Sequence, residues 1–365
     1  MSGGRRVEVT GVARTPVRDA GVLEAAVAAV RAALRDAGVP GSEVDGVLAS
    51  GPSAVDVADA LGFELSWRVD ESDREAVGAA LVGAVDVVAA GRVRHLVCVE
   101  AFRAAPRTRR PGRFGPAAPV GGRASWHAPY GADDGVVVAA LAARAYTERY
   151  GLTRAELAQI ALVASANTGG GLRLRDYLTA PMVADPLCVY DRAAQAGGAA
   201  AVVLGAPEVT DDRGRSIEIA GVGAAYAVSP LWEQESARSD GPVERAGAGL
   251  LARSGHTDRD VDVVLLGDEY ASAVLPWLEA FGFCGPGLAG GFVATGRRIS
   301  RDGPVPVNPH GGHLGLGRRP DLDLMVEAVQ QVRGEAGASQ LPGPRRVAVV
   351  GLAGPTAAGC VLLRR

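Results

Sequence analysis

The stretches DAGVPGSEVDGVLASG (36–51) and RSGHTDRDVDVVLLGD (253–268) are two copies of one pattern. At one constant offset, Gly38 aligns with Gly255 and Asp45 with Asp262. In each copy a glycine and a short polar loop lead into an apolar run of the kind that forms a buried strand. A 365-residue chain that repeats such a unit is expected to fold as two related halves around a large shared core.

The repeat continues along both halves. Three further pairs of segments match: ALGF (60–63) with AFGF (280–283), AAGRVRHLVCVEA (89–101) with LPGPRRVAVVGLA (341–353), and GGAAAVVLGA (197–206) with TAAGCVLLRR (356–365). Apolar runs alternate with helical patterns, which is typical of an α/β protein with a largely parallel sheet covered on both faces. We predict one half at residues 1–210, with a loop insertion at about 102–190, and a second half at 211–365.

Composition excludes several classes of function. The formal charge of −3 gives no overall attraction to nucleic acid or to an anionic membrane. No apolar run approaches the ~20 residues of a membrane span, and the N-terminus lacks a secretion-signal pattern, so we expect a cytoplasmic protein. The four cysteines form no CxxC pair and have no metal-ligand spacing, so no metal site is expected. All 38 basic residues are arginines, which excludes lysine Schiff-base chemistry and covalent pyridoxal phosphate.

Candidate acid and base groups lie in NPHGGHLGLGRRP (308–320) and DEYAS (268–272). A glycine-rich turn would place His310 and His313 near a helix N-terminus, where the pKa of histidine is lowered. Tyr270 could carry a proton if a positive charge such as Arg318 lay close to it. The alternatives are that His310 only fixes the loop, that Tyr270 only packs against it, and that Asp268 caps the following helix.

The order and spacing of several motifs carry a resemblance to a known family. These motifs are WHAPYGADDG (126–135), YTERYGLTRAELAQIALVASAN (146–167), RDYLTAPMVADPLCVYD (175–191), DEYAS, GFCGPG (282–287), PVNPHGG (306–312) and VEAVQQVRG (326–334). With them the chain resembles the thiolase superfamily, in particular the sterol-carrier-type thiolases and the lipid-transfer-protein branch, which includes retro-aldolases. The resemblance implies a duplicated thiolase fold with αβαβα layers, mixed mostly parallel sheets in two pseudo-symmetric halves, a dimer, and a coenzyme A thioester as ligand without a covalently bound cofactor.

The chain departs from the family at each catalytic position that the resemblance implies. The nucleophilic cysteine would fall at about Arg74, and the catalytic histidine falls on Arg318. The second cysteine would fall near Gly351, and the asparagine that orders a water falls on Gly267. Thiolysis or Claisen condensation through an acyl-cysteine is therefore excluded, since loss of a nucleophile or its base costs about a million-fold in turnover in a comparable catalytic unit.

The arginines and the loop remain candidates for binding the thioester, because guanidinium groups bind phosphate with two parallel hydrogen bonds. The candidate substrate-binding residues are Arg318, His313, Gly311, Gly312, Asn308, Arg74, Arg107, Arg109 and Arg110. Two alternatives stay open: the arginine-rich segment is only a surface loop, or Arg74 and Arg318 plug the old site by pairing with Asp70, Glu71 or Asp73.

Two functions follow from this pattern. The loss of every expected catalytic group favours a non-catalytic subunit, forming a homodimer or pairing with a thiolase-like chain or a small OB-fold acyl-CoA-binding protein. The other is a cysteine-independent carbon–carbon lyase acting on an acyl-CoA, with His310, Tyr270 and the Gly311–Gly312 amides as working groups. The two functions differ in whether His310 and Tyr270 face one cavity and whether Arg74 and Arg318 fill it.

Overall fold

The computed structural model describes residues 5–17, 21–71, 76–104, 135–207, 214–227, 241–354 and 356–365. Within these ranges nine strands form one sheet in the order β3-β2-β4-β7-β1-β8-β11-β10-β9, and β5 and β6 form a separate hairpin. The strands are β1 (Glu8–Thr15), β2 (Val44–Ser50), β3 (Trp67–Glu71), β4 (His95–Arg103), β5 (Met182–Ala184), β6 (Leu187–Cys188), β7 (Gly197–Gly205), β8 (Ile217–Tyr226), β9 (Val263–Leu266), β10 (Val347–Ala353) and β11 (Ala357–Arg364).

The sheet is symmetric about the contact between β1 and β8. The order β2-β4-β7-β1 on one side is mirrored by β9-β10-β11-β8 on the other, and corresponding neighbours pair in the same direction. The duplicated α/β fold is thus confirmed, with the change of half lying between β7 and β8. Parallel pairing is confined to β3-β2-β4 and β9-β10, whereas the other pairings are antiparallel. The expected excess of parallel pairing therefore does not extend to the centre of the sheet, because each half ends in a strand that returns antiparallel to its neighbour.

The two aligned aspartates of the sequence repeat, Asp45 and Asp262, make equivalent hydrogen bonds in the two halves. The Asp45 carboxylate accepts hydrogen bonds from the backbone N–H groups of Arg94 and His95, at 2.9 and 3.2 Å from Oδ1. The Asp262 carboxylate accepts the N–H groups of Arg346 and Val347, at 2.7 and 3.0 Å. Each aspartate thereby satisfies the first amides of the neighbouring parallel strand.

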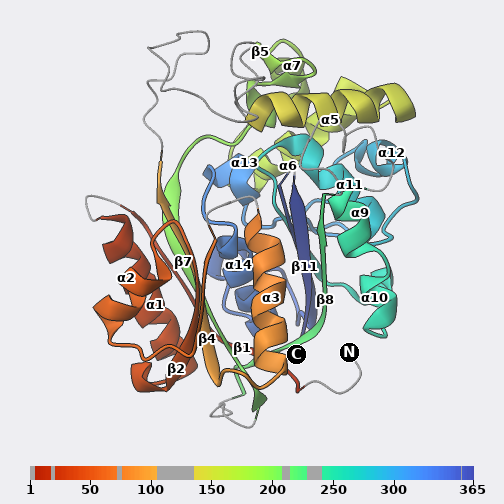
Figure 1. Cartoon of the computed structure of the whole chain (residues 1–365). Helices are drawn as coiled ribbons and strands as arrows, with labels where there is room; N and C mark the ends of the chain where they lie inside the picture. The colour runs from red at the N-terminus through yellow and green to blue at the C-terminus, as the bar shows by residue number, and fades with distance from the viewer. Residues whose placement is uncertain are drawn as a thin grey trace.

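Three layers of helices pack on the two halves of the sheet, and a further group of helices lies beyond one end of it (Figure 1). The helices are α1 (Val22–Ala37), α2 (Ala54–Leu61), α3 (Val77–Ala89), α5 (Gly135–Tyr150), α6 (Arg154–Asn167), α7 (Leu174–Leu178), α9 (Pro242–Gly247), α10 (Leu250–Arg253), α11 (Val274–Ala280), α12 (Ala289–Val293), α13 (Gly312–Leu316) and α14 (Leu322–Arg333). α1 and α2 cover the outer face of the first half, and α9 and α11 cover that of the second. α3 and α14 lie between the halves, so the layers follow the order αβαβα.

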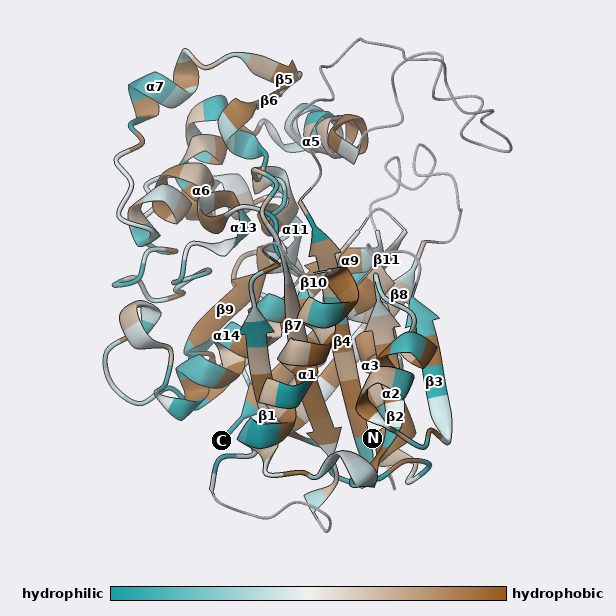
Figure 2. Cartoon of the chain, turned by 90° about the vertical axis from the view of Figure 1, so that its left-hand side faces the viewer, coloured by the Kyte–Doolittle hydropathy of each residue, from teal (hydrophilic) through white to brown (hydrophobic). Residues whose placement is uncertain are grey.

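Residue patterns explain which helix occupies which layer. α1 buries one face of alanines and valines and leaves the opposite face polar, as an outer helix does. α14 is buried on nearly every side, and α3 is apolar around most of its circumference. Figure 2 shows the hydrophobic residues concentrated in the strands of the sheet. None of the helices in the described ranges combines the length and apolar character needed to cross a bilayer.

The central layer packs by direct contact of backbone on backbone. A Cβ added to Gly78 of α3 would lie 2.7 Å from the Leu352 carbonyl oxygen, and one added to Gly359 of β11 would lie 2.0 Å from the Gly78 oxygen. A Cβ on Gly83, in the same helix, would meet no atom within 4 Å. Glycine is therefore required at positions 78 and 359 by close approach rather than by an unusual φ angle.

Gly78→Ala is expected to lower the free energy of unfolding by about 1–3 kcal/mol, because the added methyl group overpacks the contact between α3 and the sheet. Gly83→Ala, the same substitution in the same helix, is expected to raise it by about 0.5–1 kcal/mol, because glycine is a poor helix former. Urea unfolding of the two variants measures both changes. Equal effects of the two substitutions would contradict this description of the central layer.

A network of ion pairs joins the two halves of the fold at the C-terminal end of α14. The Asp36 carboxylate, at the end of α1, binds Arg333 at 2.7 Å and Arg215 at 2.8 Å, and accepts the Val12 N–H at 2.9 Å. Burial alone would raise the pKa of Asp36, but the hydrogen bonds from Arg333 and Val12 and the charge of Arg215 hold it below its ordinary value of 3.8.

Asp36→Asn is expected to lower the free energy of unfolding by about 2 kcal/mol at pH 7, because it leaves the Arg333 charge poorly compensated. A carboxyl whose pKa is lowered by folding stabilises the native state above its unfolded pKa and loses that contribution as pH falls through its folded pKa. The deficit of the variant should therefore shrink below about pH 4. Denaturant unfolding across this pH range tests the expectation, with the exposed Asp59→Asn on α2 as control.

Candidate functional site

A cavity of about 580 Å³ lies between the sheet and the helices α5, α9 and α11. Charged and polar side chains line one part of it: Glu269, Tyr270, His313, Arg318 and Asp321. Apolar side chains of α5 and α11 line another part. Residues of α5 and of several separate segments of the second half therefore converge on one space.

The loop of residues 308–317 is held in place by Asn308 and Asp268. Asn308, at φ 46°, pairs with Leu266 as a strand would, accepting its N–H at 2.8 Å and donating to its carbonyl at 2.9 Å. Asp268 accepts the N–H of His313 at 2.6 Å and so caps α13, a more distant helix than the following one that we expected from the sequence. Gly312 has φ 62°, and a Cβ there would lie 2.2 Å from Asp268 Oδ2. Asn308, Gly312 and Asp268 thus position His313.

His313 is a buried imidazole at the wall of the cavity. Its side chain is 2% exposed, and burial lowers its pKa although the Asp268 charge acts in the opposite direction. Among the described residues neither ring nitrogen has a hydrogen-bond partner, and Nδ1 lies 3.8 Å from Asp321 Oδ1. A neutral imidazole has one nitrogen that carries no hydrogen, and without a protein partner that nitrogen can accept a proton.

Arg318 places a fixed positive charge beside this histidine. Its Nε lies 2.6 Å from Glu269 Oε2, and its guanidinium lies over the Phe102 ring, 5.3 Å from the centroid. The backbone of Arg318 is tied to the 192–197 segment, donating to Ala194 at 2.6 Å and accepting from Gly197 at 2.9 Å. Burial raises the pKa of Glu269, and the Arg318 charge acts against that rise. Arg318 therefore lines the cavity and is paired with a carboxylate that lines it too.

Two further carboxyl groups, those of Asp321 and Glu100, lie near Arg318. Burial raises the pKa of Asp321, which lines the cavity, and the Arg318 charge opposes the rise. Burial also raises the pKa of the fully buried Glu100, and the nearby Asp321 raises it further. Glu100 Oε2 accepts the Leu322 N–H at 3.1 Å, at the start of α14. A carboxyl whose pKa is raised in this way can hold a proton near neutral pH and supply it to the cavity.

The two histidines of the loop, both predicted as candidates from the sequence, have different surroundings in the structure. His310 is buried and is not among the described residues that line the cavity; the charges acting most strongly on it are those of Glu327 and Asp323 of α14. The Gly311 amide, a candidate donor to substrate, donates instead to the Asn308 carbonyl at 2.8 Å. The cavity thus brings together Tyr270, His313 and Arg318, whereas His310 and the Gly311–Gly312 turn support the loop.

Several predicted residues lie outside the described residues: Asp73, Arg74, Arg107, Arg109 and Arg110. Of the carboxylates considered as plugs, Asp70 accepts the Ala54 N–H at 2.5 Å. Glu269, which was not among them, lies 2.6 Å from Arg318 Nε. No group of three metal-ligating side chains occurs within the described ranges.

Residues 229–364 match the family described as thiolase C-terminal domain-like. A chain of the Ltp2-ChsH2(DUF35) aldolase has the same fold, with a TM-score of 0.85 and 26% identity over 98% of this chain and 97% of that one. The chain belongs to the thiolase superfamily. The sterol-carrier type inferred from its motifs is confirmed as well.

Two sequence relatives of this thiolase-superfamily chain are lyases by name. It is 29% identical to the steroid side-chain-cleaving aldolase of Thermomonospora curvata over 340 residues, which cover 86% of this chain and 85% of the relative. It is 29% identical to the 17-hydroxy-3-oxo-4-pregnene-20-carboxyl-CoA lyase of Mycobacterium tuberculosis over 254 residues, 65% of each chain.

Two of the positions at which the resemblance places thiolase catalytic groups, Gly267 and Arg318, line the cavity, together with Ala353 and Gly354 at the end of β10. Gly351, our expected place for the second cysteine, faces the core instead, because a Cβ there would lie 2.7 Å from the Trp277 ring.

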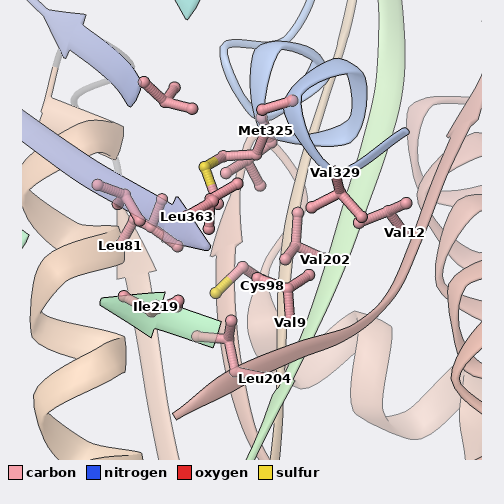
Figure 3. Close-up of a cluster of buried hydrophobic side chains, with 14 of the residues drawn as sticks. Val9, Val12, Leu81, Cys98, Val202, Leu204, Ile219, Met325, Val329 and Leu363 are labelled. Atoms are coloured by element: carbon pink, nitrogen blue, oxygen red, sulfur yellow. The ribbon is translucent and has the colours of Figure 1, made fainter. Parts of the chain in front are cut away.

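The cysteines of this chain do not restore a nucleophile. Cys98 lies among valines and leucines in the central core (Figure 3), and burial raises its pKa. Burial likewise raises the pKa of Cys188, and raises those of Cys284 and Cys360 to about 12. A thiol with a raised pKa is a poor nucleophile at neutral pH.

Sequence reasoning missed Glu269, Asp321 and Glu100. Glu269 is adjacent to Tyr270, and Asp321 directly follows the RRP of the loop and precedes a helix, so both had a positional signal. Glu100 had no such signal, because it lies within an apolar strand and its sequence neighbours do not show that it is close to the cavity.

Proposed function

We propose that this chain cleaves a carbon–carbon bond of a β-hydroxyacyl-CoA by retro-aldol chemistry, without a covalent acyl-enzyme. The observation that carries the proposal is His313, a buried imidazole with unpartnered nitrogens in the same cavity as the Arg318 charge. The names of two relatives, an aldolase and a carboxyl-CoA lyase, support the reaction class and the thioester. The raised thiol pKa values support a route that does not use cysteine.

The reaction needs a base, a stabilised enolate and an acid. His313 removes the proton from the β-hydroxyl group; the oxygen forms a carbonyl as the Cα–Cβ bond breaks, and the electron pair of that bond moves into the thioester as an enolate. Arg318 stabilises the negative charge that develops on the thioester oxygen. Asp321, whose pKa burial raises to about 6, returns a proton to Cα from its acid form. The products are a ketone or aldehyde and a shorter acyl-CoA, with no oxidant or reductant required.

Tyr270 has the second role in this proposal. It lines the cavity next to Glu269, so its hydroxyl can orient the β-hydroxyl group toward His313 or pass on its proton. The arginines of the 105–134 segment remain candidates for the phosphates of coenzyme A.

The partner is part of the proposal. The name of the Ltp2-ChsH2(DUF35) aldolase joins two components, which supports a heteromer, with a small OB-fold acyl-CoA-binding chain as the proposed second component. A non-catalytic subunit is the competing function, and it is favoured by the missing thiolase residues alone.

The test is incubation of the purified chain, alone and with a co-purified partner, with a β-hydroxyacyl-CoA that carries two carbon substituents at the β-carbon. The proposal predicts a ketone and a shorter acyl-CoA in equal amounts, detected by mass spectrometry. If calorimetry detects thioester binding but neither preparation cleaves the substrate, the lyase function is wrong and the non-catalytic role is supported.

A further inference from the structure

The cavity has a second polar position, within its apolar wall. One face of α5 lines the cavity with small residues, Val138, Ala139, Ala142 and Ala143, and Leu275 and Pro276 of α11 line it as well. Small apolar side chains leave room and offer no hydrogen bonds, so this part suits a bulky apolar group. Tyr146 and Glu279 interrupt the same wall.

Tyr146 and Glu279 are bonded to each other across two helices. The Tyr146 hydroxyl donates to Glu279 Oε1, and the Ala289 N–H donates to the same oxygen at 3.2 Å. Burial and the Glu279 carboxylate raise the pKa of Tyr146, so the phenol keeps its proton. Because the only proton of the phenol is directed at the carboxylate, the pair offers acceptor oxygens to the cavity: the phenol oxygen and the remaining lone pairs of the carboxylate.

We propose that Tyr146 and Glu279 form a subsite that binds a hydroxyl group on the apolar part of the substrate, in preference to a ketone. A hydroxyl can donate to the carboxylate, whereas a ketone has only acceptor lone pairs and would face acceptor oxygens. This rests on the proposed function in one respect, namely that the apolar part of the cavity holds the acyl group of the thioester. The subsite is separate from the cluster of His313 and Arg318, since it comes from α5 and α11.

A purely structural role for the pair makes a different prediction. If Glu279 only held Tyr146 and the start of α12, an amide would serve equally well, because the glutamine oxygen accepts the same two hydrogen bonds. In a ligand subsite, Glu279→Gln keeps those bonds but places an NH2 donor where the second carboxylate oxygen was. The variant should then prefer the ketone.

The experiment is calorimetric titration with two probes of one carbon skeleton, a perhydrophenanthrenol and the corresponding perhydrophenanthrenone. The wild-type chain is expected to bind the alcohol about 10- to 100-fold more tightly, as a hydrogen bond to a charged group contributes. Glu279→Gln is expected to remove or reverse the preference, and Tyr146→Phe to reduce it. Glu148→Gln, exposed on the same helix, is the control and should leave the ratio unchanged.

Equal binding of the two probes by the wild-type chain, binding of neither, or the same ratio in Glu279→Gln would overturn the subsite. Thermal melting of each variant separates loss of binding from loss of fold. The outcome is distinguishable from that of the cleavage assay. If the chain prefers the alcohol but does not cleave the thioester, the subsite is supported and the lyase function is wrong. If it cleaves the thioester but shows no preference, the lyase function is supported and the subsite is wrong.

Discussion

His313→Gln is expected to lower kcat for retro-aldol cleavage by ~100- to 10,000-fold, the contribution of a general base. Glutamine is close to histidine in size and keeps polar atoms in the cavity, but it cannot accept the hydroxyl proton at neutral pH. The backbone N–H of residue 313 still donates to Asp268, so the cap of α13 is preserved. Steady-state kinetics of the cleavage with wild-type and variant protein measure the loss.

The pH dependence provides a second check on His313. Burial lowers its pKa below the ordinary 6.5, so the neutral, base-competent form persists to lower pH than in a free histidine. The acid limb of kcat/KM should lie below pH 6.5 and disappear in His313→Gln. His310→Gln is the matched control in the same loop. A loss of activity in that variant as large as in His313→Gln would reject our assignment of the two histidines.

Arg318→Gln is expected to lower kcat by ~100- to 1000-fold, the effect of removing one group that stabilises a developing oxyanion. The loss should appear in kcat rather than in KM, because the negative charge on the thioester oxygen exists only in the transition state and enolate. Arg318→Lys should recover part of the rate, since an ammonium group supplies the charge but not the planar geometry.

The neighbouring arginine is the control for Arg318. Arg319 pairs with Asp323 of α14 at 3.5 Å and is 34% exposed, so Arg319→Gln should change kcat by less than about threefold, as expected for an exposed ion pair. If Arg318→Gln raised the affinity for the thioester and left turnover unchanged, Arg318 would be a plug of the cavity and not a catalytic residue.

Much of the fold could be predicted from the sequence because it is duplicated. The aligned Asp45 and Asp262 occupy equivalent places and make equivalent hydrogen bonds, so the repeat reports on tertiary structure. The contact between β1 and β8 could not be predicted, because each is the first strand of its own half and the sequence repeat does not show how the two halves pair. The pattern of short apolar runs also gave no signal for strand direction, and parallel pairing was overestimated for that reason.

The site was predictable as a loop but not as a set of contacts. NPHGGH indicates that a histidine lies at a glycine turn, but the φ of Gly312 and the bond from Asp268 decide that His313, and not His310, faces the cavity. Likewise nothing in the sequence indicated that Glu269, adjacent to Tyr270, lies 2.6 Å from Arg318 Nε.

The central claim is that this cavity breaks a carbon–carbon bond through a free enolate. The most direct measurement is cleavage of a β-hydroxyacyl-CoA in D2O, with mass spectrometry of both the intact protein and the released acyl-CoA. We predict that the released acyl-CoA carries deuterium at Cα and that the protein gains no mass during turnover. An acylated protein, or an unchanged substrate in the presence of chain and partner together, would contradict the claim.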